Sequence, residues 1–431
     1  MLERITHPYN LQKALESVER NKGAAGIDGI RHTELRKHFT QKRSTILQQI
    51  QDGNYLPQAI LGKEIPKANG RKRLLGIPTT TDRLLQQATS QVLMTMYEKE
   101  FHENSYGFRT RKNAHGGISK AMEYIHSGKQ WIVDIDLKNF FDEVNHCLLL
   151  NLLYQKVRCN KTMKLIRSWL RAPISIGGKL HKRRKGIPQG SPLSPLLANI
   201  LLNEFDKEMT RRGFSFVRYA DDFSIYTESE MKAKMIKGIV TKFLTKKLDL
   251  PINQEKSGIR RPSTFSMLGF RFVPFYEKKT KGTYQLTVAE KGWDKLKQTL
   301  KELTRKTSPI TLLERIRKIK EVQRGWITYF RGTNIYGRLR ELDGWLRNRL
   351  RLCIWKNWKK PERKRKNLIR LGVPPDQAYA WSRTRLGTWR IAQSPILTTT
   401  ITLKRLKQKG YESMLEVYLK LNPSFYQPRS T

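Results

Sequence analysis

Two adjacent carboxylates at a predicted hairpin turn constrain the fold of this chain more than any other sequence feature. They belong to the run Tyr219-Ala220-Asp221-Asp222. The flanking segments, residues 214–219 and 223–226, are short and rich in aromatic and β-branched side chains. Such segments on either side of a tight turn are typical of a β-hairpin. The sequence therefore predicts that both acids lie where two paired strands meet.

A second predicted strand carries further acids. Residues 131–136 are apolar apart from Asp134 and Asp136. Side chains two positions apart lie on the same face of a strand, so both acids face one way. Carboxylates gathered on one sheet repel one another and take up protons unless a cation neutralises them. Hard oxygen ligands suit Mg²⁺, with Mn²⁺ as an alternative, and two such ions together can assist phosphoryl transfer.

The overall charge indicates what carries the phosphates. The chain has 84 Lys and Arg against 37 Asp and Glu, a net charge of +47 over 431 residues. A charge of this size favours a polyanionic partner, and nucleic acid is the leading candidate. Three scattered cysteines argue against a disulfide framework and fit a reducing cytosol. We expect no membrane partner, because no apolar run of 18 or more residues and no signal peptide is found.

The order of predicted elements indicates a split β-α-β-β-α sheet. Helices are expected at 195–210 and at about 230–248, between and after the strands already described. This order is typical of a ferredoxin-like sheet, which would bring the acids together. We expect Ser194 to cap the first of these helices, with Pro195 at its first position. Just before it, Gln189 and Gly190 would face a ligand, since glycine permits close backbone approach.

Two regions outside this sheet carry cations. Residues 63–82 read as a hairpin turning at Asn69-Gly70, with basic residues on both arms that suit either a triphosphate or simple solvation at the surface. Near the start of the chain, Asn10 is expected to cap a short helix. After about residue 280, long helices replace strands. Residues 347–370 hold eleven Lys and Arg with one acid, Glu362, which indicates either phosphate contacts or a solvated helix face.

An apolar stripe runs through this basic region and predicts which way its helix faces. Leu342, Leu346, Leu350 and Ile354 recur at helical spacing, so they should pack inward while the cations face outward.

Five ordered motifs resemble those of group II intron reverse transcriptases and maturases. They are Asp136-Leu-Lys-Asn-Phe-Phe141-Asp142, Gly186-Ile-Pro-Gln189-Gly190-Ser191-Pro-Leu-Ser-Pro195, Tyr219-Ala-Asp221-Asp222, Asn253-Gln-Glu-Lys256 and Leu268-Gly269-Phe270. The segment Ser105-Tyr-Gly-Phe-Arg109 is similar to part of the fingers of these enzymes, and residues 325–330 and 342–349 are similar to their thumb or maturase region. Nothing resembling the nuclease domain of larger members is found, so the resemblance is to the bacterial type without it.

The resemblance implies an α+β right-hand polymerase. Its parts would be an N-terminal extension at 1–62, fingers and ferredoxin-like palm at 63–278, a helical thumb or maturase region at 279–362 and a basic nucleic-acid-binding segment at 363–431. The enzyme would be an RNA-directed DNA polymerase located in the bacterial cytoplasm. Its partners would be an RNA template, a DNA or RNA primer, dNTPs, structured intron RNA and target DNA.

The resemblance also assigns roles to individual residues. Asp136, Asp221 and Asp222 would bind the two metal ions, and Asp136 is preferred over Asp134 because Phe141, the expected aromatic gate against a ribose 2′-OH, lies five residues after it. Lys67 and Arg73 would hold the triphosphate, Gln189 and Gly190 would line the nucleotide pocket, and Lys256 would protonate pyrophosphate unless it is simply a surface lysine. The expected nucleic-acid contacts in the basic region are Arg347, Arg349, Arg351, Lys356, Arg363, Lys364, Arg365 and Lys366.

Three other functions remain open at this point. The first is an RNA-binding splicing factor with a vestigial polymerase site, although all the expected acids are present. The second is an RNA-directed RNA polymerase, against which Phe141 argues. The third keeps the chemistry but gives it to a free-standing enzyme recruited for host DNA repair or defence.

Overall fold

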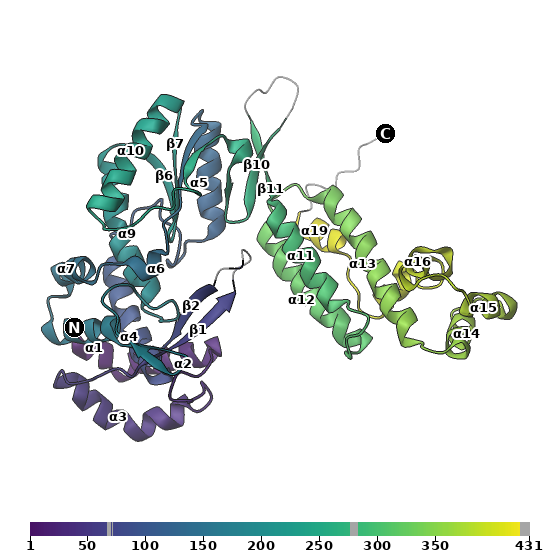
Figure 1. Cartoon of the computed structure of the whole chain (residues 1–431), viewed down its shortest axis with the longest axis horizontal. Helices are drawn as coiled ribbons and strands as arrows, with labels where there is room; N and C mark the ends of the chain where they lie inside the picture. The colour runs from purple at the N-terminus through teal and green to yellow at the C-terminus, as the bar shows by residue number, and fades with distance from the viewer. Residues whose placement is uncertain (67–69, 71, 276–282, 423–431) are drawn as a thin grey trace. The chain divides into compact units, whose positions relative to one another are not determined.

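The computed structural model describes residues 1–66, 70, 72–275 and 283–422. The chain divides into two compact units, Met1–Phe265 and Ser266–Thr431, and each is described by itself (Figure 1). The expected boundary at 278/279 thus differs from the observed division, because the strands that follow Phe265 pair within the second unit.

Unit 1 combines many helices with two sheets. Its helices are α1 (Leu2–Thr6), α2 (Pro8–Asn21), α3 (Leu35–Gln51), α4 (Thr80–Tyr97), α5 (Ala114–His126), α6 (Phe140–Glu143), α7 (His146–Val157), α8 (Asn160–Arg171), α9 (Ser194–Arg211) and α10 (Glu230–Lys246). Its strands are β1 (Ile60–Pro66), β2 (Lys72–Ile77), β3 (Trp131–Ile135), β4 (Ile174–Ile176), β5 (Lys179–His181), β6 (Ser215–Tyr219), β7 (Asp222–Thr227) and β8 (Gly258–Arg260).

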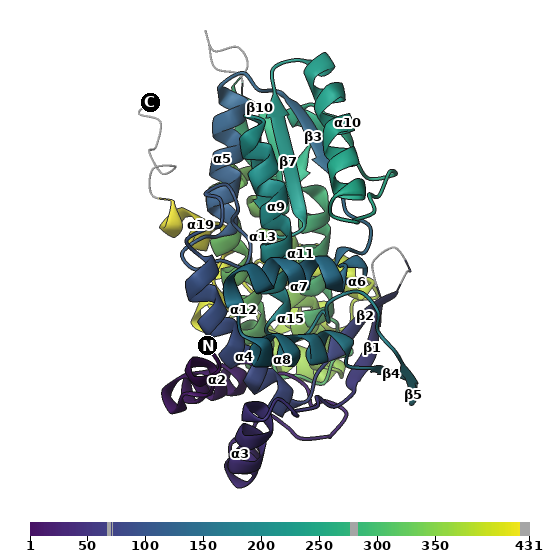
Figure 2. The same cartoon turned by 90° about the vertical axis from the view of Figure 1, so that its left-hand side faces the viewer.

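One of the two four-stranded sheets has the strand order β6-β7-β3-β8, and all its pairs are antiparallel. In chain order this is the ferredoxin-like arrangement that the sequence predicted. Figure 2 shows α9 and α10 running along these strands. Their apolar faces share one core with the strands, for example Phe205 of α9, Val240 of α10 and Ile225 of β7. The fold class is therefore α+β, as expected.

The start of α9 differs in detail from the prediction. The helix begins at Ser194 itself, with Leu193 in the capping position and no side-chain cap. The Ser194 hydroxyl instead donates to the carbonyl of Pro188, at 2.6 Å, and so holds the preceding loop. The prediction that Ser194 caps the helix was wrong, because the helix already includes Ser194 and the capping position falls on Leu193.

The second sheet of unit 1 has the order β2-β1-β4-β5. The hairpin of β1 and β2 was predicted, and its register pairs Pro66 with Lys72. Lys67 and Asn69 lie outside the described residues. The predicted cap at Asn10 was wrong: α2 begins two residues earlier, and the Asn10 amide donates to the carbonyls of Ile5 and Ala88.

Unit 2 contains a small sheet followed by helices. The strands β9 (Ser266–Met267), β10 (Phe270–Pro274) and β11 (Tyr284–Val288) form a sheet of order β11-β10-β9. The helices are α11 (Glu290–Leu303), α12 (Leu312–Phe330), α13 (Tyr336–Asn357), α14 (Pro361–Arg370), α15 (Pro375–Ser382), α16 (Thr388–Gln393), α17 (Pro395–Thr398), α18 (Leu403–Gln408) and α19 (Met414–Leu421). The expectation that strands end at about residue 280 was wrong, because β11 completes the sheet by pairing with β10.

Helix α13 organises the core of unit 2. Its predicted stripe is buried at Leu342, Leu346 and Leu350, while Ile354 is half-buried. Asp343 is also buried, and it accepts hydrogen bonds from the Tyr411 and Ser413 hydroxyls and from two backbone N–H groups at the start of α19, at 2.9 and 3.0 Å. A single carboxylate therefore ties α19 to α13.

No helix among the described residues is both long and apolar enough to cross a membrane.

Candidate active site and nucleic-acid interface

The hairpin of β6 and β7 presents the paired acids at a two-residue turn. Tyr219 pairs with Asp222, which leaves Ala220 and Asp221 as the loop. Ala220 has a φ of 57°, in the left-handed region that a residue with a Cβ atom rarely adopts. That conformation costs about 1–3 kcal/mol and persists only where the surroundings hold it.

A buried arginine holds this turn. Arg218 is fully buried and forms two hydrogen bonds with Asp206 of α9, at 2.8 and 2.5 Å. Its Nη1 group donates to the Asn199 side chain, at 2.9 Å, and to the carbonyl of Ala220, at 3.0 Å. The guanidinium therefore connects the strained residue of the turn to a helix in the core.

The segment before α5 approaches the same turn from the other side. Tyr106 and Arg218 are joined by a backbone hydrogen bond of 2.8 Å, and Asn199 donates to the carbonyl of Gly107, at 2.9 Å. A Cβ atom at Gly107 would collide with the backbone nitrogen of Ala220, so only glycine fits there. Residues 105–109, which the resemblance assigned to the fingers, pack on strand β6.

The third acid lies beside the turn. Asp136 follows the last residue of β3, and Ile135 in that strand pairs with Phe223, next to Asp222. The three carboxylates act on one another electrostatically. Burial raises the pKa of Asp222 to about 6, with further contributions from Asp221 and Asp136, although its side chain keeps access to solvent at the rim of the site. Burial also raises the pKa of Asp221, and Asp136 adds to this effect.

Asp134 of β3 and Asp136, which follows that strand, have different cationic partners in the protein. Asp134 accepts from Arg260 Nε at 2.7 Å, and burial raises its pKa while Arg260 opposes that shift. Lys256 Nζ lies 3.2 Å from Asp136 Oδ2 and has an exposed side chain. Asp134 is thus committed to a structural ion pair with β8, whereas Asp136 lies with the acids of the turn.

Two of the expected nucleotide-binding residues, Arg73 and Gln189, lie beside the acids. Arg73 on β2 donates to the Gln189 side chain. Its positive charge partly opposes the rise that burial causes in the pKa of Asp221. Gly190 makes the close backbone approach that was expected, but to the carbonyl of Gly76 on β2. This contact holds the loop against the hairpin, and the role of Gly190 in lining a nucleotide pocket stays a prediction.

Phe141 borders the same loop. Its carbonyl accepts from the N–H of Ile187, at 2.7 Å, and its ring packs edge-on against Phe140, with centroids 5.2 Å apart. The side chain is half-buried against the core. The structure therefore brings Phe141 to the loop that carries Gln189.

The acid cluster is suited to divalent metal. Among the described residues, no three or more His, Cys, Asp and Glu side chains are already arranged as a metal-binding group. The donors nevertheless fit: carboxylate oxygens are the ligands that Mg²⁺ prefers, and it typically takes one or two of them together with substrate phosphates and water. Asp221 and Asp222, whose pKa values are raised by burial and by neighbouring carboxylates, have an electrostatic need for a cation.

The predicted nucleic-acid contacts in unit 2 divide into two groups. Arg351 is only 7% exposed and donates to the carbonyl of Ile401, at 3.0 Å. Arg349 donates to the carbonyls of Lys301 and Thr304 at the end of α11, at 3.1 and 3.0 Å. The prediction that Arg351 faces outward was wrong, because it donates inside the unit to the backbone carbonyl of Ile401 and to the side chain of Asn348.

The other predicted contacts lie at the surface or near it. Arg347 is half-buried, and Lys356, Arg363 and Lys366 are exposed. Lys364 lies over the Trp355 ring, 4.6 Å from its centroid, and Arg365 is 3.6 Å from Glu362. Exposed lysines and arginines of this kind remain candidates for phosphate contacts.

Sequence reasoning missed the residues that hold the site together. These are Asp206, Asn199, Gly107, Arg218 and Arg260. The available signal was a charged residue at 218 within an otherwise apolar strand, since a buried charge requires a partner.

Comparisons with known proteins agree with this arrangement. Residues 65–272 match the family described as reverse transcriptase (RNA-dependent DNA polymerase), and residues 293–372 match the maturase-specific domain of group II introns. The chain is thus a reverse transcriptase joined to a maturase domain. The two matches together are consistent with the group II intron reverse transcriptase and maturase family.

Several relatives show how far the similarity extends. Protein YkfC of Escherichia coli K12 is 28% identical over 314 residues, which cover 63% of this chain and 82% of YkfC. The group II intron-encoded protein LtrA of Lactococcus lactis is 37% identical over 206 residues, which cover 48% of this chain and only 34% of LtrA. A chain of the partial Cas6-RT-Cas1–Cas2 complex is 25% identical and has a TM-score of 0.37, with 57% of this chain and 42% of that chain covered.

Proposed function

We propose that this chain is an RNA-directed DNA polymerase of the group II intron type, copying RNA into cDNA by metal-assisted phosphoryl transfer. One observation carries the proposal: Asp136, Asp221 and Asp222 meet at the ends of adjacent strands, beside Arg73 and Gln189. The family match over residues 65–272 supports the same activity.

Reverse transcriptases use divalent metal ions. In this chain Asp136, Asp221 and Asp222 would hold them, and we propose two Mg²⁺ ions, with Mn²⁺ as a substitute. When bound, such ions activate the attacking hydroxyl and stabilise the charge on the leaving group.

The remaining residues bind and orient. Arg73, set by its hydrogen bond to Gln189, would hold the triphosphate of a dNTP. Phe141 would pack under the sugar and disfavour a 2′-OH. Lys256, an exposed ammonium 3.2 Å from Asp136, would donate a proton to pyrophosphate.

The test is primer extension on an RNA template with the full chain. Asp221→Asn should lower the rate by several orders of magnitude while the protein still folds. Asp134→Asn is the comparison, since Asp134 is held by Arg260, and it should lose less activity. Near-wild-type extension by folded Asp221→Asn would refute the assignment.

We also propose that the chain binds structured intron RNA and assists splicing, and that it serves mobility through contacts with target DNA. The match of residues 293–372 to the maturase-specific domain supports this role. A splicing time course at lowered Mg²⁺, with and without the protein, tests it on the flanking intron. No acceleration by wild-type protein would favour a free-standing enzyme of repair or defence.

A further inference from the structure

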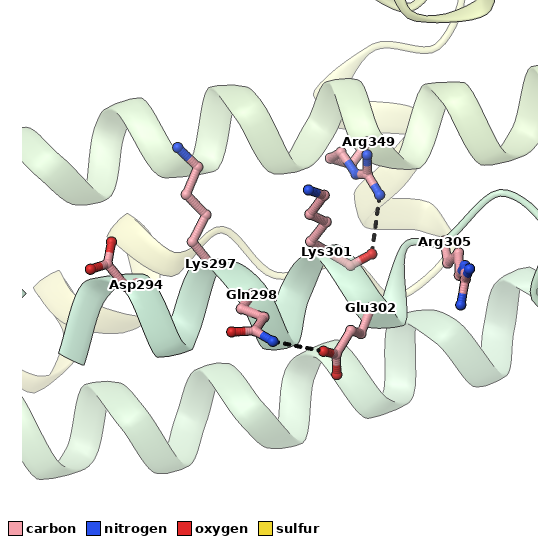
Figure 3. A pocket seen from close by; sticks show the side chains of 7 residues that line it. All are labelled: Asp294, Lys297, Gln298, Lys301, Glu302, Arg305 and Arg349. Atoms are coloured by element: carbon pink, nitrogen blue, oxygen red, sulfur yellow. Dashed lines mark hydrogen bonds between the residues drawn. The ribbon is translucent and has the colours of Figure 1, made fainter. Parts of the chain in front are cut away.

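A basic groove lies on the surface of unit 2, between α11 and α13. One hollow of about 620 Å³ is joined to another of about 320 Å³, because Arg305 and Arg349 line both. Five cations and one tryptophan face this groove: Lys297, Lys301, Arg305, Lys306, Arg349 and Trp389. Figure 3 shows Lys297 and Lys301 pointing from α11 toward the helix that carries Arg349.

The charges of the groove are unbalanced and partly preorganised. Only two acids, Asp294 and Glu302, line it, and Glu302 accepts a hydrogen bond from Gln298 at 3.2 Å. Lys297 and Arg349 both lie over the ring of Trp345, 5.8 and 5.7 Å from its centroid. Arg349 is also fixed by its bonds to the end of α11. Such cations are positioned to meet phosphates without first being ordered.

Trp389 gives the groove a second kind of contact. It lines the smaller hollow and is 38% exposed, which is unusual for so large an apolar ring. A paired base is already stacked within its duplex, whereas an unpaired base can stack on an aromatic side chain. A track of cations that ends at an open indole therefore fits a single strand.

We propose that this groove binds a single-stranded RNA segment, with consecutive phosphates along Lys297, Lys301 and Arg305 and one base on Trp389. The choice of RNA rests on the proposed function. The groove includes Arg349, one of the nucleic-acid contacts that the sequence indicated, but the cations at 363–366 do not line it.

The experiment measures binding of a labelled, unstructured RNA 12-mer to the full chain by fluorescence anisotropy over a range of salt concentrations. The groove variant is Lys297→Ala with Lys301→Ala. Its matched control is Lys291→Ala with Lys295→Ala, two exposed lysines of the same helix that do not line the groove. Loss of two phosphate contacts should reduce the slope of log K against log salt by about 1.4. The control should keep the wild-type slope.

Trp389→Ala provides the second arm. It should weaken binding roughly tenfold and leave the salt slope unchanged, because stacking releases no counterions. On a fully paired RNA of the same sequence it should have no effect. Circular dichroism melting checks that each variant is folded.

Several results would overturn the proposal. They are an equal loss in the control pair, wild-type affinity in Trp389→Ala, or equal losses on single-stranded and paired RNA. Primer extension by the wild type is measured separately. Protein that binds the 12-mer through the groove but extends no primer would refute the polymerase function and leave the groove intact.

Discussion

The buried ion pair between Arg218 and Asp206 should control both stability and the geometry of the acidic turn. The perturbation is a pair of substitutions, Asp206→Leu and Arg218→Met, made singly and together. Leu and Met have no charge and approximate the volumes that they replace. Comparing the two single variants with the double variant therefore separates the effect of losing a charge partner from the effect of losing the arginine itself.

The magnitude follows from burial. Both side chains are fully buried and share two hydrogen bonds, so Asp206→Leu leaves a guanidinium without its counter-charge. Breaking such a pair from one side costs about 3–5 kcal/mol. The control is a surface ion pair on the same helix, between Lys207 and Glu204, whose side chains are 58% and 31% exposed. Breaking it with Glu204→Gln should cost at most about 1 kcal/mol of unfolding free energy.

The double variant makes the sharper prediction. Replacing both charges with apolar groups removes the desolvation penalty, so most of the lost free energy of unfolding should return. A deficit of about 1–3 kcal/mol should remain, because the Asn199 side chain and the Ala220 carbonyl lose the donor that Arg218 provides. Primer extension should stay low, because no donor then reaches the carbonyl of Ala220, at 3.0 Å from Arg218 in the wild type. Stability and activity would thus be separated in one protein.

Urea unfolding followed by circular dichroism measures the first quantity, and primer extension at saturating Mg²⁺ the second. The reasoning is refuted if the double variant is stable and extends primers at the wild-type rate. In that case Arg218 would be a core residue without influence on the turn. A single variant as stable as Glu204→Gln would refute the estimate for the buried pair.

Four further outcomes are expected. Phe141→Ala should reduce discrimination between dCTP and CTP by about 1–3 kcal/mol, measured by steady-state kinetics, and an unchanged ratio would leave Phe141 as a core residue. The pKa of Asp222 is raised to about 6 in the folded state, so the protonated carboxyl contributes stability that is lost as pH rises from about 4 to 6. In EDTA the melting temperature of the wild type should therefore fall relative to that of Asp222→Asn over this pH window. Mg²⁺ should restore the melting temperature of the wild type. Arg363→Ala with Lys366→Ala should flatten the salt dependence of binding to structured RNA, whereas an unchanged slope would assign both residues to a solvated face. Asp221→Asn with Asp222→Asn should abolish DNA synthesis and still accelerate splicing, since that role needs only a surface complementary to RNA; parallel loss of both activities would contradict this separation.

Local patterns in the sequence predicted the parts of the fold that depend on short-range order. The hairpin at 219–222 was visible because strand periodicity and turn composition are local signals. The strand order of the sheet followed from the order of elements. The strand β11 was missed because it forms by pairing with β10, and local sequence patterns do not show which segments pair.

Side-chain partners were harder to predict than elements. Periodicity on α13 placed Arg351 with the outward cations, yet its acceptor lies 50 positions later, at Ile401. Arg218 pairs with Asp206 because β6 packs beside α9, and the composition of the sequence does not predict how these two elements pack. The ambiguity between Asp134 and Asp136 likewise depended on Arg260, far along the chain.

The carboxylate of Asp343 has a consequence for the order in which the protein forms during synthesis. Its hydrogen-bond donors lie 68 to 72 positions later, from Tyr411 to Leu415. Residues 1–265 can complete their own core soon after they leave the ribosome, because domains generally fold as units during translation. Unit 2 must wait for α19, since a buried acid without donors is costly. Unit 2 therefore becomes stable only after residue 415 has emerged, well beyond the end of the maturase match at 372.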